Sequence, residues 1–305
     1  MLILETLMRL IICVALILQV AHVWADVSAN NRSEDQSNKG QRLIWSIIPY
    51  PPIYILEGEY KGQGVADKYL TNAQKYLTGY AHSNELMTPA RAWYLISQGQ
   101  ELVCHPSSLK TLEREKFAYF SEAALITPVV RVLMRKTDWQ QRLKSANNMN
   151  VADYINLNNG IFGIVSQRSY GEKIDRLLVD LIASGKQVTQ TSGEQGSRQL
   201  YEMLVRGRID MMLEYPWVSA YFNKTLKDQT VEVVNLEIAD FPRYTPAYVA
   251  CTRNSAGKAL ITKLNRFIQQ TIIGEDNRHR MTNWLDEKEA ADYEKDYLDY
   301  FKIAH

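Results

Sequence analysis

Short apolar runs alternate with longer amphipathic stretches along most of this chain. Continuous apolar or β-branched segments predict buried strands, at residues 43–48, 101–104, 127–134, 162–166, 209–213 and 231–235. Residues 237–249 are expected to form a crossing that returns to the first sheet. Apolar residues spaced three and four apart predict helices, at residues 65–77, 88–98, 170–183, 197–205 and 255–273, with two more before the C-terminus. Thr88 is placed to cap the second of these helices. Strands that alternate with long helices predict an α/β fold class with two mixed sheets.

Residues 99–121 contain the clearest local pattern. They predict, in order, a strand, a polar turn and the start of a helix, at residues 101–104, 105–109 and 111. The hydroxyl of Thr111 is placed to cap this helix, with Ser107 and Ser108 before it and Arg114 in its first turn. Free N–H groups, hydroxyls and an arginine together bind a small anion, usually a carboxylate. The alternative is a surface helix whose arginine pairs with a neighbouring glutamate.

The first 25 residues predict a cleavable signal peptide. A basic residue precedes an apolar run over residues 10–20, and small residues precede a cleavage site after Ala25. The run is too short for a membrane span. Either Met1 or Met8 fits as the start of translation, and the polar composition of residues 26–40 predicts a disordered leader. We therefore expect export to a Gram-negative periplasm.

Composition narrows the function classes. The chain has 305 residues, of which 46% are hydrophobic and 23% charged, and its formal net charge is +1. A near-neutral chain without a basic block is not expected to bind nucleic acid. The five histidines are scattered, and no nucleophile motif, metal-ligand spacing or phosphate-binding loop occurs. We expect no enzyme, no cofactor and no metal site.

Several motifs follow one another in an order that resembles a known family. They are Tyr50-Pro-Pro-Ile, Gly62-Gln-Gly64, Ser107-x3-Thr-x2-Arg and Gly207-Arg-Ile-Asp210. Over residues 42–284 they resemble a divergent branch of the bacterial extracellular solute-binding proteins of family 3. The resemblance implies a two-lobed type II periplasmic binding protein fold, in which each lobe is a mixed β-sheet flanked by helices and two crossover strands join the lobes. It assigns residues 41–130 and 247–305 to lobe one, and residues 131–246 to lobe two. Near the C-terminus Tyr293, Tyr297 and Tyr300 recur at helical spacing, and we expect this stripe to pack on lobe one rather than to bind a ligand.

The resemblance also implies ligand contacts in lobe one. Tyr50 matches the family's ligand-stacking aromatic residue, and Arg91 falls near a contact position. A rigid surface loop and a solvated arginine are the alternatives for these two. The family's carboxylate clamp corresponds to Ser107, Ser108 and Arg114. Leu109 departs from the family pattern, because many relatives have another hydroxyl there.

In lobe two the resemblance points to Arg168 and Ser169, at a strand-to-helix turn suited to an anion. A solvent-facing turn is the alternative. Amino-acid binders of the family have an aspartate for the α-ammonium group at the position of Tyr215. Either Glu214 takes over this ammonium group or the ligand is not an α-amino acid, since an unpaired ammonium group is costly to bury. With Trp217 close by, we expect an anionic or aromatic-bearing solute.

Cleavage of the signal peptide leaves two cysteines, Cys104 and Cys251. An even pair in an oxidising compartment favours a disulfide. The resemblance implies that the two lie on adjacent strands, which is close enough for a bridge. The alternative is two separate buried thiols.

The resemblance therefore implies a periplasmic protein that captures a small polar or anionic, amino-acid-like solute by hinge closure. As a transport receptor it would deliver the solute to an inner-membrane ABC permease. As a sensor component it would act on a membrane kinase instead. A third alternative is a small lyase or dehydratase with Glu214 as its acid/base residue. We expect a monomer with a small-molecule ligand.

Overall fold

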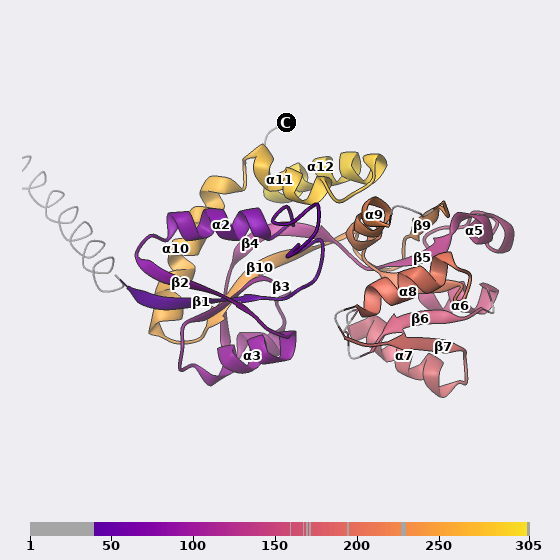
Figure 1. Ribbon diagram of the computed structural model, residues 1–305, viewed down its shortest axis with the longest axis horizontal. Helices are drawn as coiled ribbons and strands as arrows, with labels where there is room; N and C mark the ends of the chain where they lie inside the picture. Colours follow the sequence, from indigo (N-terminus) through magenta and orange to yellow (C-terminus); the bar gives the residue numbers. More distant parts are fainter. Residues whose placement is uncertain are drawn as a thin grey trace, which may run out of the picture.

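The computed structural model describes residues 40–303 apart from 159, 167, 169, 171, 194 and 227–229. Over this part the chain forms two lobes side by side, each built around one five-stranded sheet (Figure 1). The predicted signal peptide, and the predicted leader up to residue 39, lie outside the described residues. In the described part no helix is both long and apolar enough to span a membrane.

The first sheet combines parallel strands with one reversed strand. Its order is β2 (Tyr80–Leu86), β1 (Gln41–Ile47), β3 (Val103–Ser108), β10 (Tyr244–Thr252) and β4 (Ala118–Pro128). β1 runs parallel to β2 and β3, whereas β10 runs antiparallel to β3 and β4. The apolar run that predicts the first strand is buried from Leu43 to Ile47, because helices cover both faces of this sheet.

The second sheet repeats this order. It contains β7 (Val188–Thr191), β6 (Phe162–Val165), β8 (Met211–Glu214), β5 (Arg131–Arg135) and β9 (Val233–Leu236). β6 is parallel to β7 and β8, and β5 is antiparallel to β8 and β9. In each sheet the reversed strand is the one that enters from the other lobe. The predicted two-lobed α/β fold with two mixed sheets is confirmed.

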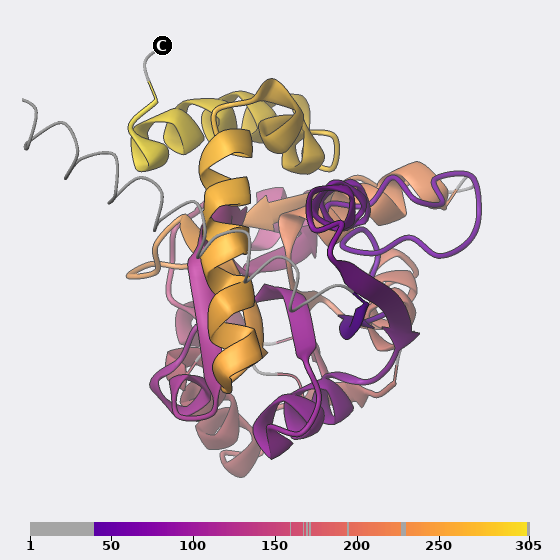
Figure 2. The same cartoon turned by 90° about the vertical axis from the view of Figure 1, so that its left-hand side faces the viewer.

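Helices cover both faces of the first sheet (Figure 2). α2 (Asp67–Tyr76) and α10 (Ser255–Thr271) share one apolar cluster with Leu43 and Trp45, while α3 (Pro89–Gln98) packs with Ile44. These strand residues alternate between the two clusters because successive side chains of a strand point to opposite faces. As predicted, the Thr88 hydroxyl accepts the N–H of Arg91 and caps α3.

Helices also cover both faces of the second sheet. α5 (Lys136–Arg142), α6 (Val151–Asn158) and α7 (Glu172–Ala183) adjoin one face, and α8 (Gly196–Val205) and α9 (Pro216–Thr225) the other. The apolar cluster under α8 and α9 continues into the first lobe, where it includes Ile126 and Trp284. The two lobes therefore share one packed region.

The crossings between the lobes differ from their predicted form. β4 ends at Pro128 in the first sheet and β5 begins at Arg131 in the second, so residues 127–134 are not one continuous strand. The second predicted crossing strand, residues 237–249, becomes regular only at Tyr244. Both predictions were wrong in this respect, because a segment that leaves one sheet must turn before it can pair with the other.

β3 extends beyond its predicted end. Residues 105–108, predicted as a turn, continue the strand because β10 pairs with them and places Tyr248 opposite Ser108. Cys104 and Cys251 face each other in the same ladder, with Cα atoms 4.1 Å apart, and form the predicted disulfide. The one-turn helix α4 (Leu112–Glu115) follows, and the Thr111 hydroxyl caps it as predicted.

The C-terminal helices α11 (Glu275–Thr282) and α12 (Glu287–Phe301) complete the described chain. Tyr293 and Tyr297 are fully buried, and their hydroxyls donate to the carbonyls of Ile126 and Ile272, both at 2.9 Å. The predicted packing of the tyrosine stripe on lobe one holds for these two residues. It is wrong for Tyr300, which is 48% exposed because Phe301 packs on Tyr297 in its place.

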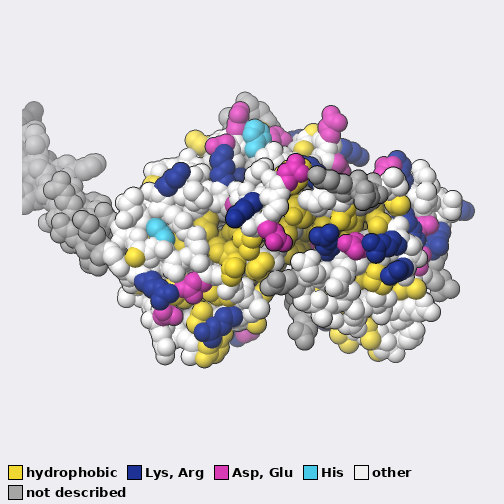
Figure 3. All heavy atoms as spheres, viewed as in Figure 1, with side chains coloured by type: hydrophobic (Ala, Val, Ile, Leu, Met, Phe, Trp, Pro, Cys, Tyr) yellow, Lys and Arg dark blue, Asp and Glu magenta, His cyan; other side chains and the backbone are white. Residues whose placement is uncertain are grey.

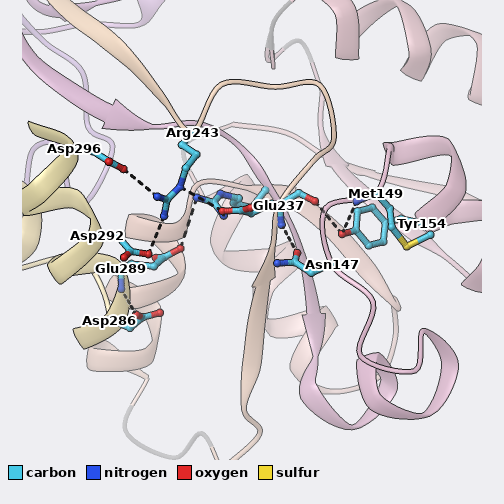
Figure 4. A network of polar contacts seen from close by, with 10 residues as sticks. Asn147, Met149, Tyr154, Glu237, Arg243, Asp286, Glu289, Asp292 and Asp296 are labelled. Carbon is cyan, nitrogen blue, oxygen red and sulfur yellow. Dashed lines mark hydrogen bonds and ion pairs between the residues drawn. The ribbon is translucent and has the colours of Figure 1, made fainter. Parts of the chain in front are cut away.

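Ion pairs tie α12 to both crossings (Figure 4). Arg243, just before β10, donates to Asp292 at 2.9 Å and to Asp296 at 3.0 Å. Arg131, the first residue of β5, pairs with Glu237 at 3.1 Å and lies 4.0 Å from Glu289 of α12. The C-terminal helix is therefore attached where the chain passes between the lobes.

Candidate functional site

Three side chains from the ends of parallel strands meet between the lobes. Tyr50 lies just after β1 in the first lobe, Arg168 lies just after β6, and Glu214 is the last residue of β8. In open α/β sheets ligands bind outside the carboxyl ends of the strands. The three residues are far apart in the sequence, and they come together because these strand ends lie close to one another.

The carboxylate of Glu214 is fully buried and accepts four hydrogen bonds. Its Oε1 accepts from the Tyr50 hydroxyl at 2.8 Å and from the backbone N–H of Tyr215 at 3.0 Å. Its Oε2 accepts from Nη1 of Arg168 at 2.8 Å and from the Ser197 hydroxyl at 2.5 Å. A carboxylate offers about four lone-pair positions, so the protein's own four donors occupy the accepting capacity of Glu214.

Arg168 is stacked on an aromatic ring as well as paired. Its guanidinium carbon lies 4.9 Å from the ring centroid of Tyr50, within range of a cation–π contact. Burial alone would lower the pKa of Arg168, but the Glu214 carboxylate and the Tyr50 hydroxyl raise it above its ordinary value. Burial, and then the charge of Glu214, raise the pKa of Tyr50 well above its ordinary value. Arg168 therefore stays charged, and Tyr50 stays a donor.

Trp217 lies between two tyrosine rings. It meets Tyr50 edge to face, with centroids 5.5 Å apart and an interplanar angle of 80°, and it stacks on Tyr215 at 4.8 Å and 19°. Burial and the charge of Glu214 raise the pKa of Tyr215 to about 12. The indole Nε1 of Trp217 is buried and has no hydrogen-bond partner among the described residues. Rings with a polar edge suit a small amphipathic solute.

Five of the predicted ligand residues thus form one group, hereafter the Glu214 group: Tyr50, Arg168, Glu214, Tyr215 and Trp217. Their role in ligand binding remains a prediction. Ser169 lies outside the described residues. Sequence reasoning missed Ser197, whose only local signal is its place at the start of the helix predicted over residues 197–205.

The side chains of the predicted carboxylate clamp have contacts of their own. The Ser108 hydroxyl donates to the Tyr248 carbonyl at 3.1 Å, and Nη1 of Arg114 donates to the Leu109 carbonyl at 2.9 Å. The Arg114 guanidinium also lies 4.2 Å from the ring centroid of Trp93. No hydrogen bond or ring contact between described residues joins these side chains to the Glu214 group.

A hollow of about 300 Å³ opens beside the predicted clamp. Its walls come from the turn after β3, from α4 and from β10, namely Leu109, Lys110, Thr111, Leu112, Glu115, Thr245, Pro246 and Tyr248. Ser107, Ser108 and Arg114 are not among them. Arg91 is exposed, and its guanidinium lies over the ring of its own helix neighbour Tyr94, at 5.5 Å. Ligand contacts by the clamp and by Arg91 remain predictions.

The Glu214 group offers hydrogen-bond donors, one guanidinium and aromatic faces. Among the residues that the structure describes, no three His, Cys, Asp or Glu side chains are grouped to hold a metal ion. The arrangement is suited to non-covalent recognition of a small solute, since its polar atoms are positioned by one another and by the ends of three strands.

Comparison with known proteins shows similarity in fold. No family model matches the chain, and no curated protein matches it. The probable amino-acid ABC transporter extracellular-binding protein ytmK from Bacillus subtilis superimposes with a TM-score of 0.59 at 16% identity, covering 82% of this chain and 100% of that one. The periplasmic VFT2 domain of BvgS from Bordetella pertussis gives 0.55 at 14% identity, covering 84% and 97%. An ancestral arginine-binding protein bound to arginine gives 0.56 at 15% identity, covering 81% and 98%. The chain therefore has the two-lobed fold of extracellular solute-binding proteins.

Proposed function

We propose that this protein is exported and captures a small polar or anionic solute between its lobes by hinge closure. One observation carries the proposal: the hydroxyl of Tyr50 in the first lobe donates to Glu214 in the second, 164 residues along the chain. Side chains of both lobes thus share one buried polar group. A solute that contacts this group would stabilise the arrangement in which the lobes meet.

Both crossings supply the hinge in this proposal. Residues 129–130 separate β4 from β5, and residues 237–243 separate β9 from β10. Short irregular segments between packed sheets can absorb backbone rotation. The similarity in fold to extracellular binding proteins supports capture of a solute rather than its chemical conversion.

We assign the captured solute to ABC-type uptake. The support is the similarity in fold to ytmK, a probable amino-acid ABC transporter extracellular-binding protein. Signalling to a membrane kinase would need the same binding step, so binding alone does not separate the two. Cells that carry or lack the gene should differ in accumulation of the labelled solute if uptake is correct. Equal accumulation, with solute-dependent changes in gene expression, would favour sensing.

Binding is tested first with a thermal-shift screen of the purified protein against amino acids, dicarboxylates, aromatic acids and small sugars. A solute at about a hundred times its dissociation constant should stabilise the protein by about 2.7 kcal/mol. The Tyr50→Ala variant should lose this shift, because it removes the side chain that joins the lobes.

The matched control is Tyr76→Ala, since Tyr76 is the last residue of α2, is 40% exposed and belongs to no predicted ligand contact. It should keep the full shift. A screen without any shift, or a shift that survives Tyr50→Ala unchanged, would contradict capture between the lobes.

A further inference from the structure

We propose that Arg168 and Glu214 form a resident ion pair, through which the site selects solutes that present a carboxylate or another acceptor and that lack an α-ammonium group. This inference rests on the proposed function and names its substrate class. It makes Glu214 a positioning residue, which fixes Arg168, rather than the residue that receives a charged amino group.

The first argument is the number of bonds to Glu214. Its two oxygens already accept from Tyr50, Tyr215, Arg168 and Ser197, at 2.5–3.0 Å. An ammonium group could bind there only by displacing at least one of these donors. Each displaced donor would remain without a partner in a buried region, and the displaced Arg168 would also lose its countercharge.

The second argument is the surplus of donors. A guanidinium group has five N–H bonds, and among described residues only Nη1 of Arg168 makes a hydrogen bond, to Glu214. Trp217 adds a buried indole N–H that has no partner in the described part of the chain. The other N–H groups of Arg168 and the indole N–H of Trp217 therefore have no acceptor among the described residues, and a carboxylate or carbonyl oxygen of the solute would supply one.

The third argument is the set of rings beside these donors. Trp217 contacts Tyr50 and Tyr215, and Arg168 covers one face of Tyr50. A flat apolar part of the solute would add to this cluster. These features together describe an arylalkanoate-like or dicarboxylate-like solute in preference to an α-amino acid.

Calorimetric titration with matched pairs tests the inference. One pair is 3-phenylpropanoate and phenylalanine, and the other is glutarate and glutamate, so that each pair differs only in the α-ammonium group. In at least one pair the acid without the ammonium group should bind ten-fold or more tightly than its amino acid.

Two variants test the residues. Arg168→Met should weaken binding of the preferred acid ten-fold or more, because it removes the donors. Glu214→Gln should also weaken binding of this acid, since Arg168 loses the carboxylate that positions it. If Glu214→Gln fails to fold, Ser197→Ala makes a milder change, because it removes one donor to the same carboxylate. The matched control is Arg198→Met, which removes the same charge from an arginine that is 55% exposed and pairs with Glu202. It should bind like the wild type.

Three results would overturn the inference while leaving solute capture intact. They are tighter binding of the amino acid, equal binding of both members of each pair, and unchanged binding of the acid by Arg168→Met. Absence of binding by all four probes, together with no hit in the wider screen, would instead remove the proposed function and this inference with it.

Discussion

At the scale of the residue, the imidazole of His105 is enclosed on the inner side of α3. Its ring meets Trp93 at 5.6 Å, and its Nδ1 has no partner in the described part of the chain. Burial, and then the positive charge of Arg114, lower the pKa of His105 from 6.5 to about 4. The folded protein therefore holds this imidazole neutral where an unfolded chain would accept a proton.

This shift predicts a loss of stability in acid. Because the pKa is lower in the folded state, the contribution of His105 is complete above pH 6.5 and is lost as the pH falls to about 4. Chemical denaturation at each pH should show that wild type loses up to about 3 kcal/mol more than His105→Gln over this range. Measurements at pH 7.5 give the baseline difference between the two proteins. If the free energy of unfolding falls equally with pH in the wild type and in His105→Gln, the prediction is wrong.

At the scale of the element, the turn between α11 and α12 joins the lobes through Trp284. The indole is 2% exposed and lies edge-on to Tyr60 of the first lobe, at 5.5 Å, and 5.6 Å from Tyr221 of α9. Its Nε1 donates to the Gln63 carbonyl at 3.2 Å, and Lys224 of α9 donates to the Asn283 carbonyl. The C-terminal turn thus connects α9 to the first lobe.

Trp284→Ala should therefore both destabilise the protein and loosen the contact between its lobes. A cavity of this size costs about 3–5 kcal/mol in free energy of unfolding, and the radius of gyration from X-ray scattering should increase. The matched control is Trp139→Ala, because Trp139 packs within the second lobe and donates to the Ala146 carbonyl at 2.7 Å. It should reduce stability without changing the radius of gyration. An unchanged radius in Trp284→Ala would show that Trp284 does not hold the lobes together.

At the scale of the whole molecule, the Cys104–Cys251 disulfide closes a long segment of chain. The two residues are 147 positions apart, and the entire second sheet lies between them in sequence. Figure 3 shows the lobes meeting across their middle and separated by a notch at the lower edge. Because the bridge lies in the first sheet, it joins the chain before it enters the second lobe to the chain after it returns. It does not restrict rotation of the second lobe.

The double variant Cys104→Ala/Cys251→Ala should lower the free energy of unfolding by about 2–5 kcal/mol, because the unfolded chain regains the freedom that the closed loop removed. Solute binding should be retained at temperatures where the variant is folded. Thiol titration of the unfolded wild type before reduction gives the control. Two free thiols at that stage would show that the pair is not joined.

Much of the fold follows from local pattern. Thr88 and Thr111 cap the helices they were expected to cap, and the apolar run at Leu43 forms the first strand. These features involve residues a few positions apart, whose preferences act within one turn or one strand. The predictions for residues 105–108 and for Tyr300 were wrong, because β10 and Phe301, respectively, take part in contacts that no local pattern reports.

The sequence by itself determined where most of the strands and helices lie, and which residue types lie at the ends of the strands. Only the tertiary structure decided that Tyr50, Arg168 and Glu214 share one buried group, since these residues are 164 and 46 positions from their partners. It also decided which groups donate to Glu214, which the sequence left open. Four internal donors reach its two oxygens. That arrangement depends on the order of strands in two sheets, and strand order is set by packing across the whole chain.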